Sequence, residues 1–197
     1  MLPCVLVLGG LDPGGGAGLA ADVRAVSAAG AFACPVVALI TVQSTAGLVS
    51  AHAVAPGLVL AQAREVLRVQ RVRAIKIGAL GSAANVRAAA RLLAEHAHLP
   101  AVLDPVLVPT RGRARLLDRD ALAAMQDELL PRAALVTANA PEAAALLGEP
   151  ATRVTTLADA RRAARALVLL GARAVLVKGG HLRTRDAIDV LAARAGG

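Results

Sequence analysis

Aromatic residues are almost absent from this sequence, whose 197 residues include one Phe, Phe32, and neither Trp nor Tyr. Proteins that bind single-stranded nucleic acids stack the bases on aromatic side chains, and one Phe cannot supply such a platform. The formal net charge of +8 does not change this conclusion, because the arginines are scattered along alanine-rich segments. We therefore expect no nucleic-acid partner.

Cysteine is also scarce. Cys4 and Cys34 are the only two, and neither belongs to a CxxC pair or to a cluster with the four histidines. The histidines themselves lack HExxH or a similar ligand spacing. This pattern argues against a structural zinc site and against a disulfide framework, so we predict that both thiols are buried as small hydrophobic groups.

Long hydrophobic runs are missing as well. The stretch from Ala31 to Val42 is shorter than the roughly 18 residues that a membrane helix needs, and it contains Pro35. The N-terminal MLPCVLVLGG has no basic segment and no small-residue cleavage site. We therefore expect a cytoplasmic protein without membrane contact. Its length and its hydrophobic content of 56% suit a single domain over residues 1–197.

Short apolar runs rich in Val, Ile and Leu alternate with longer alanine- and arginine-rich segments of helical character. This alternation predicts an α/β fold with a largely parallel central sheet. The predicted strands are Cys4–Leu8, Val36–Val42, Ala74–Ile77, Ala101–Leu103, Ala134–Thr137 and Ala174–Val177. The predicted helices are Ala17–Ala29, Leu58–Val69, Ala83–Ala97, Asp120–Leu130, Glu142–Leu147 and Leu157–Leu170. Glycine and proline cluster at the strand ends, which should gather at one edge of the sheet and build one site.

The segment GGLDPGGGAGLAADV, from Gly9 to Val23, is a glycine-rich loop between a predicted strand and a predicted helix. Gly16, Gly18 and Ala21 match the dinucleotide fingerprint GxGxxG/A, but the second strand ends in Gln43 and not in the acid that would hold the ribose hydroxyls. The absence of a GK pair and of GxSxG disfavours a P-loop and an α/β-hydrolase. We interpret the loop as one that brings backbone amides and Asp22 close to a small ligand.

Four further loops place polar side chains at strand ends. Gln43 carries an amide that can both donate to and accept from a heterocycle. Asp104 in DPV suits a magnesium ion or its waters. Asn139 and Glu142 in TANAPE offer oxygen ligands for a hard cation or phosphate-bound water, and Lys178 in VKGGH is suited to neutralise a nucleotide phosphate. Each alone could be a loop cap or a surface charge, but together at one sheet edge they indicate phosphoryl transfer.

In their order along the chain, these motifs resemble those of the hydroxymethylpyrimidine and phosphomethylpyrimidine kinases of thiamine biosynthesis, in the ribokinase superfamily. The matching segments are Gly10–Asp22 (family GxDPSGGAGxxAD), Thr41–Thr45 (TAQNT), Lys76–Leu80 (KIGML), Val102–Val106 (VLDPV), Thr137–Ala143 (TPNxPEA) and Val175–His181 (VLVKGGH). The resemblance implies a ribokinase-like three-layer αβα sandwich with a mostly parallel central sheet. It also implies phosphorylation of 4-amino-5-hydroxymethyl-2-methylpyrimidine and of its monophosphate, with ATP and Mg²⁺.

The resemblance further assigns roles by motif position. The residues that would line the pyrimidine pocket are Gly10, Asp22, Gln43, Ala79 and Val106. Magnesium would be held by Asp104 and Glu142, and the nucleotide would be contacted by Asn139, Glu142 and Lys178. A homodimer is implied as well, since the family tends to dimerise.

The sequence departs from the family pattern in several places, among them Gly14 for the family's Ser and Ser44 for its Asn. Ala79 stands where the family has Met, which removes bulk beside the ring and keeps a pyridoxal or pyridoxine kinase open as an alternative. A basic residue, Arg111, follows in a lid-like segment, but outside the family's KSG context. The family's GTGC or GTGD segment, with its anion hole and catalytic base, does not occur before Gly197. The sequence thus predicts a C-terminally incomplete domain with impaired activity, and a non-catalytic pyrimidine-binding regulatory protein is a further alternative.

Overall fold

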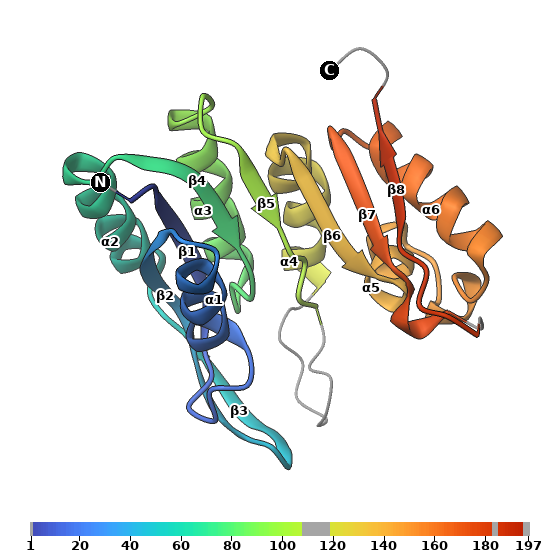
Figure 1. Cartoon of the computed structure of the whole chain (residues 1–197), viewed down its shortest axis with the longest axis horizontal. Coiled ribbons are helices and arrows are strands. Elements are labelled where there is room, and N and C mark those ends of the chain that lie inside the picture. Colours follow the sequence, from blue (N-terminus) through green and yellow to red (C-terminus); the bar gives the residue numbers. More distant parts are fainter. Residues whose placement is uncertain (1, 108–118, 183–184, 195–197) are drawn as a thin grey trace.

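The backbone forms one eight-stranded sheet with helices packed against it (Figure 1). The computed structural model describes residues 2–107, 119–182 and 185–194, so the predicted lid-like segment with Arg111 lies outside the described residues. The strands are β1 (Cys4–Leu11), β2 (Phe32–Ser44), β3 (Gly47–Ala53), β4 (Val72–Ile77), β5 (Ala101–Leu103), β6 (Leu135–Asn139), β7 (Ala174–Lys178) and β8 (Val190–Ala193). The α-helices are α1 (Gly18–Ala28), α2 (Pro56–Val69), α3 (Ala83–Glu95), α4 (Arg119–Ala124), α5 (Ala140–Leu146) and α6 (Leu157–Leu169).

The strands lie in the order β3-β2-β1-β4-β5-β6-β7-β8. The six strands from β2 to β7 in this order pair in parallel, whereas β3 and β8 pair antiparallel at the two edges. All six predicted strands are present, which confirms the mostly parallel sheet. The two edge strands were not predicted, and β2 begins at Phe32 instead of Val36.

Strand β1 is apolar along most of its length because both of its faces are covered. On β1, Leu6 and Leu8 belong to the large core on the side of α2 to α6, whereas Val7 packs with Leu19 of α1 in a smaller core on the opposite face. Within the described residues, Figure 1 shows α1 as the only helix on that second face, over β1 and β2. None of the described helices has the length and apolar content needed to cross a membrane.

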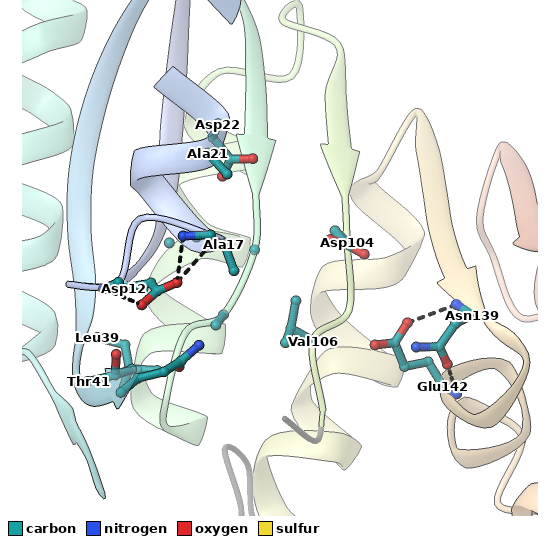
Figure 2. Close-up of a pocket in the computed structure, with 18 of the residues that line it drawn as sticks. Asp12, Ala17, Ala21, Asp22, Leu39, Thr41, Asp104, Val106, Asn139 and Glu142 are labelled. Carbon is teal, nitrogen blue, oxygen red and sulfur yellow. Dashed lines mark hydrogen bonds between the residues drawn. The ribbon is translucent and has the colours of Figure 1, made fainter. Parts of the chain in front are cut away.

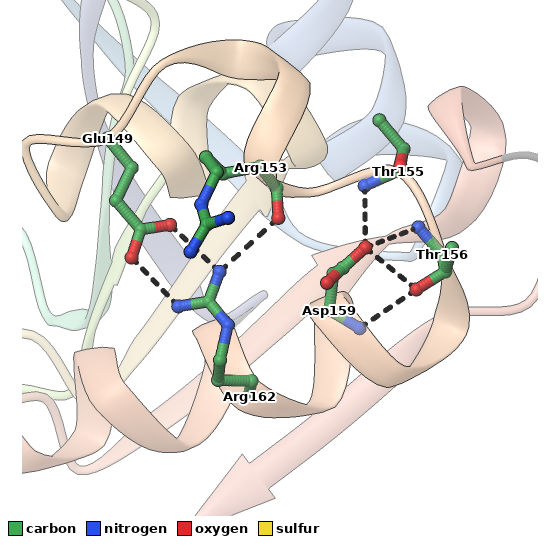
Figure 3. Close-up of polar contacts among 6 residues, drawn as sticks. All are labelled: Glu149, Arg153, Thr155, Thr156, Asp159 and Arg162. Atoms are coloured by element: carbon green, nitrogen blue, oxygen red, sulfur yellow. Dashed lines mark hydrogen bonds and ion pairs between the residues drawn. The ribbon is translucent and has the colours of Figure 1, made fainter.

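Polar contacts fix the connection between α5 and α6 (Figure 3). Thr156 and Asp159 form a capping box at the start of α6, in which the Asp159 amide donates to the Thr156 hydroxyl at 3.2 Å and the Thr156 amide donates to Asp159 Oδ2 at 3.0 Å. One turn further on, the Arg162 guanidinium donates two bonds of 2.8 Å to the Glu149 carboxylate and a third to the Arg153 carbonyl. The start of α6 therefore has polar partners for its free backbone amides, and the Arg162 guanidinium ties the helix to the preceding connection.

Both cysteines are buried on the first two strands. Cys4 and Cys34 are 5% and 6% exposed and form no disulfide, which confirms the prediction that they act as small hydrophobic groups. Burial raises the pKa of the Cys34 thiol, so the uncharged form is favoured there.

Candidate active site

A pocket of about 910 Å³ lies at the carboxyl ends of the parallel strands. It spans the place where the strand order reverses, because β1 is flanked by β2 on one side and by β4 on the other. Gly9 and Gly10 at the end of β1 and Gly78 and Ala79 after β4 line it. Open α/β sheets bind their ligands at such a reversal, since the loops diverge there and leave a crevice. The expected gathering of strand-end loops at one edge is thus present.

The carboxylate of Asp12 fills the concave side of the glycine-rich loop (Figure 2). It accepts hydrogen bonds from the backbone amides of Gly14 at 2.8 Å, Gly16 at 3.1 Å and Ala17 at 2.9 Å, and the residue is only 7% exposed. Successive amides of this kind form a nest that attracts an anion, and here the anion belongs to the chain itself. These three amides are therefore not available to a nucleotide phosphate, and the loop serves as a wall of the pocket.

Gly18 lets α1 begin in close contact with the end of β1. Its φ is +55°, and a Cβ atom at this position would stand 2.2 Å from the Gly10 carbonyl oxygen. Only glycine can combine this backbone conformation with this close approach. The first turn of α1 is consequently held against the sheet edge, and Asp22 on the next turn lines the pocket.

One end of the pocket combines an apolar wall with an amide and an ion pair. Ala79 and Val106 pack against the buried side chain of Leu39. Gln43 lines the same end, and among the described residues its side-chain amide has no hydrogen-bond partner. An apolar surface beside an unpaired amide suits a flat heterocycle with its own donor and acceptor.

The ion pair at this end joins Asp22 to Lys76 near the end of β4. The Lys76 ammonium donates to Asp22 Oδ2 at 2.7 Å, and the two side chains are 24% and 21% exposed. Lys76 belongs to the KIG motif that the sequence comparison used, but it was not predicted as a site residue.

The other end of the pocket carries two carboxylates and one lysine. The Lys178 ammonium at the end of β7 donates to Asp104 Oδ1, beyond β5, at 3.0 Å. Asn139 and Glu142 form a capping box at the start of α5, with the Glu142 amide donating to Asn139 Oδ1 and the Asn139 amide donating to Glu142 Oε2, both at 2.8 Å. Figure 2 shows the second carboxylate oxygen of Glu142 directed away from α5 toward the pocket.

Burial raises the pKa of Glu142, which is 6% exposed. The hydrogen bond from the Asn139 amide and the charge of Lys178 act in the opposite direction, and Asp104 adds to the rise. The pKa is raised overall because burial disfavours the charged carboxylate more than these contacts favour it.

The carboxylates at this end match the ligand set that magnesium takes in enzymes that bind phosphate esters. Across the described ranges, no three His, Cys, Asp or Glu side chains come together as a metal cluster. Mg²⁺ usually keeps several waters and uses one or two carboxylates together with substrate phosphates, so Asp104 and Glu142 suffice. The donor set fits a metal that is shared with a phosphorylated ligand.

All nine residues that the sequence singled out line this one pocket: Gly10, Asp22, Gln43, Ala79, Asp104, Val106, Asn139, Glu142 and Lys178. Their individual roles stay predictions. The pocket also includes residues that the sequence analysis missed, among them Asp12, Leu39, Thr41, Lys76 and His181. A signal existed for Asp12, because an Asp shortly before a run of glycines commonly accepts hydrogen bonds from the amides that follow it.

Comparison with known proteins identifies the family. A family model described as phosphomethylpyrimidine kinase matches residues 12–197. The chain belongs to this family. It is 39% identical over 191 residues to the hydroxymethylpyrimidine/phosphomethylpyrimidine kinase of Salmonella typhimurium, an alignment that covers 97% of the chain and 71% of that protein. It is 41% identical over 187 residues to the thiamine biosynthesis bifunctional protein ThiED of Geobacter sulfurreducens, with 95% of the chain and 37% of that longer protein covered.

Solved structures of kinases share the fold of this phosphomethylpyrimidine kinase family member. The phosphomethylpyrimidine kinase from Clostridium difficile superposes with a TM-score of 0.86 at 30% identity, covering 99% of this chain and 82% of that one. An ADP complex of Bacillus subtilis pyridoxal kinase also gives a TM-score of 0.86, at 25% identity, covering 98% of this chain and 71% of that one. The predicted family and its ribokinase-like α/β fold are confirmed.

Proposed function

We propose that this phosphomethylpyrimidine kinase family member transfers the terminal phosphoryl group of ATP to the hydroxymethyl group of 4-amino-5-hydroxymethyl-2-methylpyrimidine, and then to the monophosphate, in thiamine biosynthesis. The observation that carries the proposal is the convergence of separate strand-end loops on one pocket with two chemically different ends. The names of the related kinases from Salmonella typhimurium and Clostridium difficile support it.

The apolar end suits the aminopyrimidine ring. Leu39, Ala79 and Val106 offer a surface on which a flat ring can lie. The free amide of Gln43 can accept from an exocyclic amino group and donate to the adjacent ring nitrogen, which is the pattern of an aminopyrimidine edge. Asp22, held by Lys76, adds an ionised acceptor for a further donor of the substrate.

The charged end suits a nucleotide with its metal. Asp104 and Glu142 exceed Lys178 by one negative charge when both carboxyls are ionised, so a cation is needed there. Asp104 and Glu142 would hold magnesium directly or through its waters, and Lys178, with Asn139 nearby, would contact phosphate oxygens. Bound magnesium neutralises the charge of the phosphates. The ammonium of Lys178 can hold the transferred group in position without itself reacting.

A homodimer acting in the cytoplasm is also part of the proposal. No Asp, Glu, Lys or Arg occurs between Arg24 and Arg64. This stretch contains the hairpin of β2 and the edge strand β3, where Ile40, Val42 and Val49 are 49%, 51% and 76% exposed. Sheet edges that face water are usually protected by charges. Two copies of a chain with a net charge of +8 repel each other least when they meet through an uncharged surface.

The free cysteines support the cytoplasmic part of the proposal, because free thiols are in keeping with a reducing compartment.

A pyridoxal kinase is the second candidate. The Bacillus subtilis pyridoxal kinase superposes as closely as the Clostridium difficile phosphomethylpyrimidine kinase, with the same TM-score of 0.86. Ala79 leaves room beside the ring position for a differently substituted ring. The two candidates differ in the compound that is phosphorylated, so the substrate end of the pocket must separate them.

Binding and turnover measured side by side test the proposal. The purified chain is titrated calorimetrically with the hydroxymethylpyrimidine and with pyridoxal, and both are then assayed with ATP and MgCl₂. We expect tighter binding and faster phosphorylation of the pyrimidine. Gln43→Glu, which removes an N–H donor at constant size, should weaken pyrimidine binding, whereas Gln70→Glu outside the pocket should not.

Three results would overturn the proposal in different ways. A preference for pyridoxal would favour the second candidate. Binding of the pyrimidine without turnover would favour a non-catalytic pyrimidine-binding protein. Neither binding nor turnover with either compound would contradict both kinase assignments.

A further inference from the structure

Lysine occurs in this chain only where the pocket needs a cation. The sequence contains twenty arginines but two lysines, Lys76 and Lys178, and both line the pocket. Each pairs with one aspartate through a single hydrogen bond. A guanidinium would grip a carboxylate with two parallel bonds, as Arg162 does with Glu149, whereas an ammonium is a compact point charge that exchanges partners more readily. Both cations that line the pocket are therefore ammonium groups, which can exchange one hydrogen-bond partner for another.

The pair of Lys178 and Asp104 stands where the nucleotide and its metal are proposed to bind. The two side chains are 40% and 28% exposed, so both are accessible from the pocket. Glu142 supplies a second carboxylate whose free oxygen faces the same space (Figure 2). The Lys178 ammonium is thus bound to Asp104 and also acts through its charge on Glu142. A divalent cation would need the Asp104 carboxylate, and phosphate oxygens would need the Lys178 ammonium. In this structure the two groups are bound to each other.

We propose that Lys178 acts as a placeholder cation: paired with Asp104, it keeps a divalent cation from binding until nucleotide phosphates draw the ammonium away and release the carboxylate. This inference rests on the proposed function, because it takes the charged end of the pocket as the nucleotide end. It adds that the cation and the nucleotide do not bind independently. The coupling must act equally on both ligands, since binding free energies are reciprocal.

The first test removes the lysine charge and measures the metal alone. Mn²⁺ is titrated without nucleotide and followed by the loss of the free-ion signal in electron paramagnetic resonance. We expect Lys178→Met to bind Mn²⁺ roughly tenfold more tightly than the wild type, a size typical of coupling between sites. Lys178→Arg keeps the charge and should bind Mn²⁺ as weakly as the wild type. Lys76→Met removes an equal charge at the other ion pair and should also leave Mn²⁺ binding unchanged.

The second test is the reciprocal one, with ATP in the presence of EDTA. Asp104→Asn should bind metal-free ATP about tenfold more tightly than the wild type, because Lys178 no longer has to leave an aspartate. The double variant with Lys178→Met separates this effect from simple repulsion between carboxylate and phosphate. In that background the gain from Asp104→Asn should largely disappear, since interacting residues are not additive. The exposed Asp127→Asn is the matched control.

The inference is overturned if Lys178→Met binds Mn²⁺ no more tightly than the wild type, or if Asp104→Asn gives the same gain with and without Lys178. Circular dichroism of each variant shows whether it is folded. If Lys178→Met is not, the titration of Asp104→Asn with metal-free ATP decides, because an affinity no higher than that of the wild type would overturn the inference. Neither titration contains the pyrimidine. Intact coupling without pyrimidine phosphorylation would therefore refute the proposed function alone, and turnover without coupling would refute the placeholder role alone.

Discussion

The ammonium nitrogen of Lys76 lies 2.7 Å from Asp22 Oδ2, although the two residues are 54 positions apart in the sequence. The residue two positions after the lysine is Gly78, and a Cβ atom there would stand 2.9 Å from that nitrogen. The absence of a side chain at Gly78 thus makes room for the ion pair in the wall of the pocket. Asp22 is held in one orientation, with its charge balanced.

Lys76→Met should weaken pyrimidine binding about tenfold, or about 1.4 kcal/mol, because Asp22 loses the cation that orients it. Calorimetric titration with the hydroxymethylpyrimidine measures this. Arg68→Met breaks an ion pair on the exposed surface of α2 and should leave the affinity unchanged. Unaltered binding by the Lys76 variant would mean that the pair does not contribute to the substrate site.

Asp12→Ala should destabilise the protein by about 3 kcal/mol, because three backbone amides of the glycine-rich loop lose a charged acceptor. Asp12→Asn retains one carbonyl oxygen and should lose less. Urea unfolding gives both values. Asp127→Ala, at an exposed aspartate, should stay within about 0.5 kcal/mol of the wild type. A loss as small for Asp12→Ala would show that the loop keeps its shape without the internal anion.

The same substitution at two glycines should have effects of opposite sign. Gly18→Ala forces a Cβ atom to within 2.2 Å of the Gly10 carbonyl at a positive φ, so the start of α1 must move and both stability and pyrimidine binding should fall. Gly57 lies in α2 with open space around it, and Gly57→Ala should stabilise the protein by about 0.5–1 kcal/mol. Thermal unfolding compares the two, and equal shifts would contradict the close approach at Gly18.

The raised pKa of Glu142 predicts how stability depends on pH. The folded protein holds this proton more tightly than the unfolded chain, whose carboxyl has the ordinary pKa of 4.5. The contribution of Glu142 is therefore fully present below that value and is lost as the pH rises through the raised folded pKa. Glu142→Gln can still accept from the Asn139 amide but has no charge to bury, so its stability should not show this loss. Urea unfolding in EDTA from pH 4 to pH 8 compares the two proteins, and parallel pH profiles would contradict the raised pKa.

Val49→Lys should convert the proposed dimer into a monomer, because it places two like charges in an interface that has none. Val49 is 76% exposed on β3, so the change should not affect folding of the monomer. Analytical ultracentrifugation of the wild type and of the variant measures the mass. Val69→Lys, at a 61% exposed valine on α2, is the control that should keep the mass of the wild type. A monomeric wild type would refute the dimer.

The sequence predicted the strands that are made of apolar residues. The run at Cys4–Leu8 is covered on both faces, so nearly every position must be apolar. In the run at Ala174–Val177, buried positions alternate with half-buried ones, and both kinds are occupied by apolar residues. In the edge strand β3, Ser and His interrupt the apolar residues of GLVSAHA, and the edge strand β8 consists of only the four residues VLAA. Their pairing depends on a neighbouring strand more than on their own residues.

The site was predictable as a set of strand-end residues but not as a set of contacts. Because parallel strands end at one edge, Asp104, Asn139 and Lys178 had to approach each other. Which carboxylate pairs with which lysine depends on the register of strands far apart in the sequence, and Asp104 and Lys178 are 74 positions apart. The double role of Glu142, as a helix cap and as a pocket carboxylate, likewise required the position of α5 in space.

The order of the strands in the sheet has a consequence for synthesis on the ribosome. β2 adds to β1, β3 adds to β2, β4 returns to the free edge of β1, and each later strand adds to the one before it. Among the eight strands that the structure describes, every strand after the first thus finds a neighbour among residues that have already been made. The sheet can therefore grow in the direction of translation, because no described strand has to wait for a partner that is still inside the ribosome. Unpaired strand edges, which are prone to aggregation, are then exposed only briefly during synthesis.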